Sequence, residues 1–166
     1  CPDAPEKCAV SPSGFPWVDL MNQTPEQILS KSLVAEIKLN KFIEEVKSQN
    51  GLSSNEISLC GFSQGCMISL QTGIKREDSV NSILGYSGKI INKNHLNKNL
   101  KSKPKVILMH GDKDDIVPIN FLLEAKEFFS SNNYKITSKI FKNCEHRIPQ
   151  EGLSLGLDFI KKNLYK

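Results

Sequence analysis

The sequence predicts an α/β fold with a mostly parallel sheet of about four to five strands flanked by helices. Short apolar runs typical of strands alternate with longer segments whose apolar residues recur at helical spacing. Elements that alternate in this way pair their strands in parallel through right-handed crossovers. The 166 residues, of which 39% are hydrophobic and 24% charged, are ordinary for one globular domain. We therefore expect one domain over residues 1–166.

The first expected helix is the longest. Residues 1–23 are rich in proline and are expected to form a loop. The segment Thr24–Gln27 then combines a threonine cap, a proline at the first helical position and a glutamine that completes a capping box. Glycine at position 51 supplies a left-handed cap at the other end. Serines at 30–32 leave open a short break within the helix.

After Gly51 the period of the apolar residues changes, and strands and helices alternate to the end of the chain. Between two of these elements lies a lysine-rich stretch, 93–105, which we interpret as a solvated loop. The alternative is a nucleic-acid site, which the absence of interleaved aromatic residues and of an arginine cluster disfavours. Strands are expected at 56–62, 80–86, 105–109 and 134–141, and helices at 64–73, 120–131 and 151–164.

The pentapeptide Gly61-Phe62-Ser63-Gln64-Gly65 lies at the junction of an expected strand and an expected helix. A serine on such a tight turn takes up a strained backbone conformation, and its hydroxyl projects from the sheet. The residues two positions before and after it must lack bulk, because the strand and the helix pass close together. The amides at the start of the helix point to where negative charge would develop. Ser63 is thus a candidate nucleophile, and the alternative is an ordinary turn.

A serine hydroxyl needs a base, usually histidine, and a carboxylate that orients this base. The loop after the third expected strand holds three carboxylates, at Asp112, Asp114 and Asp115. The loop after the fourth holds His146. Both loops leave the carboxyl ends of strands, as Ser63 does, so their side chains are expected at one edge of the sheet. The residues alone leave the three aspartates as rivals.

The three histidines differ in their settings. His95 lies in the lysine-rich stretch and is expected to be exposed. His110 ends a buried strand and is expected to hold its own loop by hydrogen bonds. His146 alone has the position that a base requires, and the alternative is a surface residue. Among the cysteines, Cys60 and Cys66 flank the serine turn and are expected to pack as small apolar residues.

Composition argues against several classes of function. The net charge of +4 comes from dispersed lysines, so no nucleic-acid partner is expected. No apolar run approaches the length of a membrane span, so no stable membrane insertion is expected. The five cysteines do not follow the spacing of zinc sites, and neither a metal nor a cofactor is expected. A reduced, cytoplasmic setting is the simplest interpretation.

Three motifs together resemble the phospholipase/carboxylesterase family, the α/β-hydrolases that include acyl-protein thioesterases. These motifs are the pentapeptide around Ser63, the loop His110-Gly111-Asp112-Lys113-Asp114 with its following Val117-Pro118, and His146. The segments Cys1–Pro5 and Trp17–Asp19 also resemble the family's P-x-A-P and W-(F/Y)-D segments. The similarity covers essentially the whole chain.

The resemblance implies a role for each of these residues. Ser63 would be the nucleophile, His146 the general base, and Asp114 the acid, because it lies three residues before Val-Pro. The amide of Gln64 would donate to the oxyanion. The implied activity is cleavage of carboxylic esters or thioesters, of small molecules or acylated proteins, through an acyl-enzyme intermediate. An apolar pocket is expected to draw on Phe15, Trp17, Phe62, Met67 and Val117, each of which is as readily explained as a core residue.

The chain departs from the family pattern in three places. Cys66 stands where glycine is usual, and Asp115 stands where proline is frequent, so Asp112 and Asp115 remain rival acids. The family's N-terminal segment of roughly fifty residues, with early strands and a second oxyanion donor, has no counterpart here. We therefore expect a truncated α/β-hydrolase whose sheet is open beside the strand before Ser63. The alternative function is an inactive or split remnant that needs a partner chain, or a second copy in a homodimer.

Overall fold

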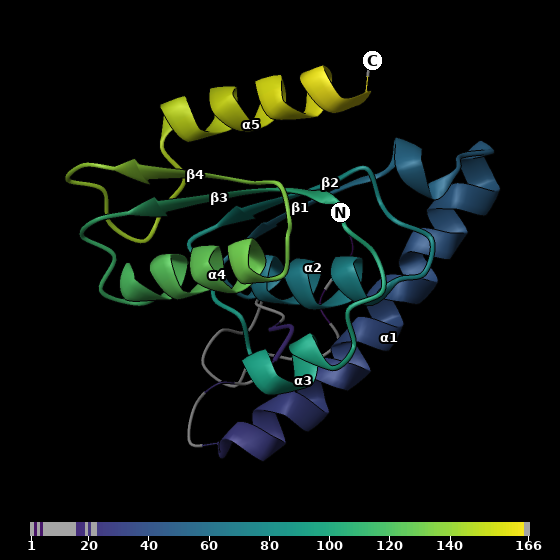
Figure 1. Ribbon diagram of the computed structural model, residues 1–166, viewed down its shortest axis with the longest axis horizontal. Helices are drawn as coiled ribbons and strands as arrows, with labels where there is room; N and C mark the ends of the chain where they lie inside the picture. Colours follow the sequence, from purple (N-terminus) through teal and green to yellow (C-terminus); the bar gives the residue numbers. More distant parts are fainter. Residues whose placement is uncertain (1, 3, 5–15, 19, 21–22, 165–166) are drawn as a thin grey trace.

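The fold is built on one sheet of four strands. The computed structural model describes residues 2, 4, 16–18, 20 and 23–164. The strands lie in the order β1-β2-β3-β4 and every neighbouring pair is parallel, which confirms the expected α/β class (Figure 1). They are β1 (Ser58–Phe62), β2 (Ser82–Tyr86), β3 (Lys105–Gly111) and β4 (Ile136–Phe141).

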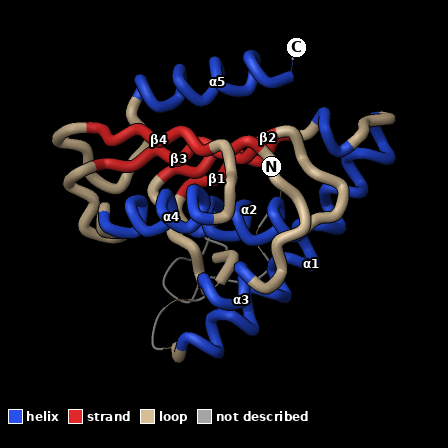
Figure 2. The backbone as a smooth tube through the Cα atoms, in the orientation of Figure 1, coloured by secondary structure: helices blue, strands red, loops and turns tan. Residues whose placement is uncertain are grey.

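Helices cover both faces of the sheet. Figure 2 shows α1, α2, α3 and α4 on one side of the strands and α5 on the other. In the part of the chain that the structure describes, no helix has the length and apolarity that a membrane crossing requires. The helices are α1 (Pro25–Asn50), α2 (Gln64–Lys75), α3 (Lys93–Asn97), α4 (Asn120–Ser131) and α5 (Gln150–Leu164).

The hydrophobic core lies in two layers, one on each face of the sheet. Successive side chains of a strand point to opposite faces, so each central strand contributes to both layers. In β3, Val106 and Leu108 belong to the core cluster that residues of α1, α2 and α4 also form, whereas Ile107 and Met109 belong to the layer under α5. Because both faces are covered, β3 is a continuous apolar run, as expected of a buried parallel strand.

The ends of α1 follow the sequence signals. Thr24 Oγ1 accepts a hydrogen bond from the Gln27 amide (3.3 Å), and Gln27 Oε1 accepts one from the Thr24 amide (2.8 Å). This reciprocal pair is the predicted capping box. At the other end Gly51 adopts φ 65° and its amide donates to the Lys47 carbonyl, which confirms the glycine cap.

The possible break at 30–32 is absent, because α1 runs without interruption. The Ser32 hydroxyl donates to the Leu29 carbonyl one turn earlier (2.7 Å) and lies 3.2 Å from Gln71 Oε1 of α2. A serine inside a helix is tolerated when its hydroxyl finds such partners. Burial of Ser32 against α2 therefore makes it part of the helix–helix contact.

The lysine-rich stretch differs from its expected form, because part of it is the short helix α3. The Asn92 side chain caps this helix by accepting from the His95 amide (2.8 Å), and Leu96 anchors it in the core. His95 was expected to be exposed, which is wrong. It is half-buried, and its Nε2 lies 3.3 Å from Lys75 Nζ of α2.

Ion pairs fix the end of α1 against the turn that follows α2. The buried Arg76 contacts Glu44 and Asp78 at 2.6 Å each, and Lys47 lies 2.7 Å from Asp78. Burial opposes ionisation of Asp78, but hydrogen bonds from Lys47, Ser54 and Arg76 outweigh it and hold its pKa well below the usual range.

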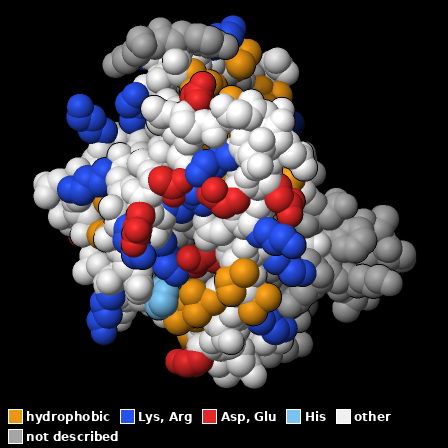
Figure 3. Space-filling view, turned by 90° about the vertical axis from the view of Figure 1, so that its right-hand side faces the viewer, with side chains coloured by type: hydrophobic (Ala, Val, Ile, Leu, Met, Phe, Trp, Pro, Cys, Tyr) orange, Lys and Arg blue, Asp and Glu red, His pale blue; other side chains and the backbone are white. Residues whose placement is uncertain are grey.

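On the face of Figure 3, which views the molecule from the amino ends of the strands, charges of both signs intermix.

The first strand, β1, lies at the border of the sheet, as expected. Among the described residues it pairs with β2 and its other edge is free.

Cys66 packs in the core, whereas Cys60 on β1 is exposed, so the expectation that both cysteines are buried is wrong for Cys60. Alternation along β1 directs Cys60 to the face that α5 covers over β2 and β3.

Candidate active site

Ser63 occupies a strained turn between β1 and α2. Its backbone has φ 52° and ψ −117°, a region that residues with a side chain rarely adopt. The Ser63 amide donates to the Tyr86 carbonyl of β2 (2.8 Å), which fixes the turn at the carboxyl edge of the sheet. The turn is the strand-to-helix serine turn that the pentapeptide predicted.

The glycines on either side of Ser63, at positions 61 and 65, differ in how much space surrounds them. A Cβ on Gly61 would overlap the backbone of Gly65, so the close crossing of β1 and α2 excludes any side chain there. A Cβ on Gly65 would meet nothing within 4 Å. The expected need for small residues on both sides of Ser63 therefore holds at Gly61 and not at Gly65.

The loops after β3 and β4 bring an acid and a base together at the same edge. His146 Nδ1 and Asp114 Oδ2 are 2.8 Å apart, which places a proton on Nδ1 that is donated to the carboxylate. The Asp114 side chain is fully buried and the His146 side chain is 17% exposed. The second imidazole nitrogen, Nε2, is then free to accept a proton.

Backbone amides turn the Asp114 carboxylate inward. Asp114 Oδ1 accepts from the amides of Ile116 (3.1 Å) and Val117 (2.8 Å). Burial opposes ionisation of Asp114, but the hydrogen bonds from Val117 and His146 outweigh it, so its pKa lies below the usual range. Asp114 is thus an anion at neutral pH, held beside the His146 imidazole.

The other two aspartates of this loop have different surroundings. Asp115 is exposed, and the half-buried Asp112 accepts a long hydrogen bond from the Cys144 amide (3.4 Å). Of the three rivals, Asp114 is the one in contact with His146.

A second histidine supports the acid loop. His110 Nε2 lies 2.7 Å from the Val117 carbonyl and 3.3 Å from Asp114 Oδ2. Burial lowers the pKa of His110, although the Val117 carbonyl and the Asp114 charge oppose this effect. A neutral imidazole that donates from Nε2 to Val117 follows, and the prediction that His110 holds its own loop is confirmed.

The base lies next to the serine turn. The rings of Phe62 and His146 have centroids 4.7 Å apart and are tilted by 41°. Because Phe62 directly precedes Ser63, this contact brings the imidazole to the part of the sheet edge where Ser63 lies. No hydrogen bond joins Ser63 to His146 in the described part of the chain, and such bonds are often long in free enzymes.

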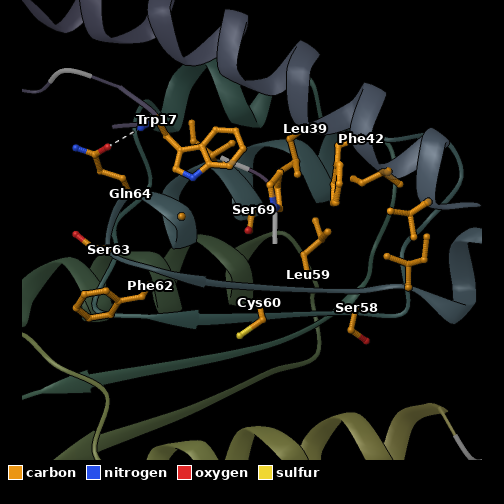
Figure 4. A pocket seen from close by; sticks show the side chains of 16 residues that line it. Trp17, Leu39, Phe42, Ser58, Leu59, Cys60, Phe62, Ser63, Gln64 and Ser69 are labelled. Atoms are coloured by element: carbon orange, nitrogen blue, oxygen red, sulfur yellow. Dashed lines mark hydrogen bonds between the residues drawn. The ribbon is translucent and has the colours of Figure 1, made fainter. Parts of the chain in front are cut away.

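An apolar groove of about 860 Å³ runs from Ser63 along the free edge of β1, under α1. Figure 4 shows Ser63 and Gln64 at one end of this groove and Ser58 at the other. Trp17 and Phe62 also line it, as expected. The remaining lining residues are Pro2, Leu39, Phe42, Ile43, Val46, Ile57, Leu59, Cys60, Gly65, Ile68 and Ser69.

The Gln64 side chain holds the segment that carries Trp17. Its Oε1 accepts from the amides of Trp17 (2.9 Å) and Val18 (3.3 Å), and Figure 4 shows the first of these bonds. The Gln64 amide lies in the first turn of α2, where amides have no partner within the helix. That amide is therefore free to donate to a ligand beside Ser63.

Two expected pocket residues lie elsewhere. Met67 is buried in the core, and Val117 is buried with its backbone bonded to Asp114 and His110. Neither lines the groove. Phe15 lies outside the described residues. Apolar character alone predicted these positions and could not tell which face of an element each side chain takes.

One residue at this edge was missed. Ser87 follows β2 and has a positive φ of 48°, like Ser63. The signal in the sequence is a Ser-Gly pair directly after a buried strand, which is also the composition of an ordinary turn.

The comparison with known proteins agrees with this geometry. A model of the phospholipase/carboxylesterase family matches residues 1–164. Acyl-protein thioesterase 1 of Saccharomyces cerevisiae is 29% identical, over 98% of this chain and 76% of that protein. Esterase YpfH of Escherichia coli is 24% identical, over 94% of this chain and 66% of that protein.

Solved structures show the same fold. The crystal structure of esterase PE8 superimposes with a TM-score of 0.92 at 32% identity, covering 98% of this chain and 77% of that one. Arabidopsis thaliana SOBER1, at 19% identity, has a TM-score of 0.82 and covers 99% of this chain and 81% of that one. These relatives are all longer than the chain described here.

Proposed function

The chain belongs to the phospholipase/carboxylesterase family, and we propose that it is a serine hydrolase with a Ser63–Asp114–His146 triad. The observation that carries the proposal is the bond between His146 Nδ1 and the buried Asp114, at the sheet edge where the strained Ser63 turn lies. A carboxylate, an imidazole and a serine in this order along an α/β fold are the parts of acyl-transfer catalysis.

In the proposed reaction Ser63 Oγ attacks the carbonyl carbon of an ester or thioester. His146 Nε2 takes the hydroxyl proton as the new C–O bond forms, and the carbonyl oxygen becomes an oxyanion. The Gln64 amide and the positive end of α2 stabilise this oxyanion. The bond to the leaving alcohol or thiol then breaks, and His146 returns its proton to that group. Water hydrolyses the acyl-enzyme by the same steps and releases the acid.

Asp114 contributes by its charge and its orientation. Its anion favours the imidazolium that forms on His146 in each transition state. Two backbone amides fix Oδ1, so that Oδ2 stays directed at His146. The substrate class that we propose is an ester or thioester of a small molecule or an acylated protein, and Trp17 and Phe62 are the candidate contacts for its acyl group.

A fluorophosphonate probe tests the proposal directly, because it reacts with activated serines. We expect a folded sample to form one adduct, on the peptide that contains Ser63, and to hydrolyse a short-chain p-nitrophenyl ester. The same sample unfolded by heat should form no adduct. An adduct on a different residue would rule out Ser63 as the nucleophile. A folded protein that neither labels nor hydrolyses the ester would rule out an active hydrolase.

The free edge of β1 favours a second candidate, an inactive or split hydrolase that needs a partner chain. Along this edge the groove exposes apolar residues of α1 and of the segment just before β1, such as Phe42, Val46 and Ile57. Unpaired strand edges readily accept another strand. A second polypeptide, or a second copy of this chain, would cover the edge. Under this candidate the folded chain stays unlabelled by the probe until the partner is added, and size-exclusion chromatography reports any dimer.

The identity of the acid can be tested within one loop. Asp114→Asn is expected to lower kcat by about 10⁴-fold, because an amide beside Nδ1 favours the wrong imidazole tautomer. Asp115→Asn and Asp112→Asn serve as matched controls, and each should retain kcat within about threefold, since neither side chain contacts His146. Steady-state kinetics on a p-nitrophenyl ester measures all three. A larger loss in either control would move the acid role to that residue.

A further inference from the structure

One buried hydroxyl at the sheet edge has no part in the reaction above. Ser87 is 1% exposed and directly follows β2, so it lies between the strand that leads to Ser63 and the strand that leads to Asp114. Its amide donates to the Met109 carbonyl of β3 (2.9 Å). The Ser87 hydroxyl is buried and has no hydrogen-bond partner among the described residues. Buried hydroxyl groups without partners are rare.

The backbone at Ser87 is strained. Its φ of 48° is rarely adopted by residues other than glycine, asparagine and aspartate. The next residue fits tightly as well, because a Cβ on Gly88 would overlap Cys66 Sγ and lie 3.1 Å from the Ser63 carbonyl. The Ser87–Gly88 turn is therefore held firmly against the start of α2. A serine kept in such a conformation points to a role for its hydroxyl.

The acceptor sites of Asp114 leave room for one more donor. A carboxylate offers about four lone-pair sites, two on each oxygen. On Oδ1 both are used, by the amides of Ile116 and Val117. On Oδ2 one is used by His146 Nδ1. The nearby His110 Nε2 has a better acceptor in the Val117 carbonyl, at 2.7 Å compared with 3.3 Å. One site on Oδ2 is thus open.

We propose that Ser87 is a positioning residue whose hydroxyl donates to this open site on Asp114 Oδ2. The bond would fix the plane of the carboxylate, and with it the direction in which Asp114 holds the imidazole of His146. The inference rests on the proposed function, because Ser87 acts through Asp114 and touches no reacting atom.

The electrostatics of the site support this assignment. The Ser87 hydroxyl is one of the groups that hold the pKa of Asp114 down, after burial, which raises it, and after Val117 and His146, which lower it. The Ser87 hydroxyl lowers this pKa although it does not meet the distance and angle limits of a hydrogen bond. In the proposed arrangement the Ser87 side chain rotates to complete this bond, and hydrogen bonds in such sites often tighten once substrate binds.

Two substitutions distinguish the effect of losing the Ser87 hydroxyl from the effect of relieving the backbone strain. Ser87→Ala and Ser87→Gly both remove the hydroxyl, but glycine also relieves the strain of a positive φ. We expect both variants to lose kcat equally, by roughly tenfold to a hundredfold, with KM changed less than about twofold. The glycine variant should be the more stable of the two in urea unfolding. Thr72→Val removes a second buried hydroxyl, in α2, that has no hydrogen-bond partner within residues 23–164 or the other described positions, and this variant should keep full kcat.

A second readout does not depend on turnover. The Nδ1 proton between His146 and Asp114 should give a low-field proton NMR resonance, identified by its loss in His146→Ala. We expect this resonance to shift and to exchange faster with water in both Ser87 variants and to stay unchanged in Thr72→Val.

Wild-type kcat and an unchanged resonance in Ser87→Gly would overturn the inference, and so would a kcat loss in Ser87→Ala that Ser87→Gly restores. If the wild-type chain fails to label with fluorophosphonate, the proposed function fails, and the NMR comparison still decides the role of Ser87.

Discussion

Replacing Ser63 with alanine is expected to abolish ester hydrolysis, with kcat lowered by about 10⁶-fold. The loss is this large because alanine removes the atom that forms the acyl-enzyme bond, and the remaining groups act only on an uncatalysed attack by water. The Ser63 side chain makes no capping hydrogen bond to α2, so the substitution should leave the fold and KM nearly unchanged. Steady-state kinetics and fluorophosphonate labelling measure the two effects, and labelling should vanish completely.

The matched control for this experiment is Ser82→Ala. Ser82 is a buried serine at the amino end of β2, bonded to the Ser58 hydroxyl (2.8 Å) and far along the strands from the reacting edge. We expect this variant to label and to turn over like the original chain. If Ser63→Ala retained more than about one hundredth of the original kcat, the nucleophile would have to be a different residue and the proposed triad would be wrong.

The sequence predicted the elements well and their starting points less well. Strands β1, β2 and β4 each begin two residues later than expected, at 58, 82 and 136. A strand begins where a neighbour offers a hydrogen-bonding partner, and the register places Ser58 opposite Ser82. Apolar or β-branched character extends beyond that point, to Ile57 for example, whose carbonyl still accepts one backbone bond from the Asn81 amide (2.8 Å) although the paired ladder has ended. Pairing is a property of two segments, which a pattern in one segment cannot reveal.

Helix α3 was missed for a related reason. Its sequence Lys93–Asn97 is polar and only five residues long, so it has no periodicity to detect. Two contacts stabilise it, the cap by Asn92 and the burial of Leu96. An isolated helix of this length is not stable in water, which means that the surrounding structure decides its conformation.

The candidate site was predictable in part. The order of the motifs along the chain placed Ser63, the acid loop and His146 at one edge, and the structure brings Asp114 and His146 there into contact. The residues alone could not choose among the three aspartates, because the choice depends on which carboxylate the amides of Ile116 and Val117 turn inward. Ser87 escaped notice because its burial and its positive φ exist only in the folded chain.

The largest expected effect on stability comes from a single methyl group at Gly61. Gly61→Ala is expected to destabilise the fold by more than about 3 kcal/mol, because the new Cβ would overlap the backbone of Gly65 and Cys66 where β1 and α2 cross. The obstacle is the backbone of the Gly65–Cys66 peptide, so no rotation of a side chain can relieve it. Relaxation would require α2 to move away from β1, which would also move Ser63 out of its strained turn. Urea unfolding followed by circular dichroism measures the loss.

Gly65→Ala is the control within the same pentapeptide, and its expected effect on the free energy of unfolding has the opposite sign. A Cβ there meets nothing within 4 Å and lies in the first turn of α2, where alanine is favoured over glycine by about 0.5–1 kcal/mol. We therefore expect Gly65→Ala to equal or slightly exceed the original chain in stability. A Gly61→Ala variant as stable as Gly65→Ala would contradict the close crossing of β1 and α2. The strain at Ser63 would then need a cause other than the approach of these two elements, since the crossing is what forces the chain to turn so sharply at that residue.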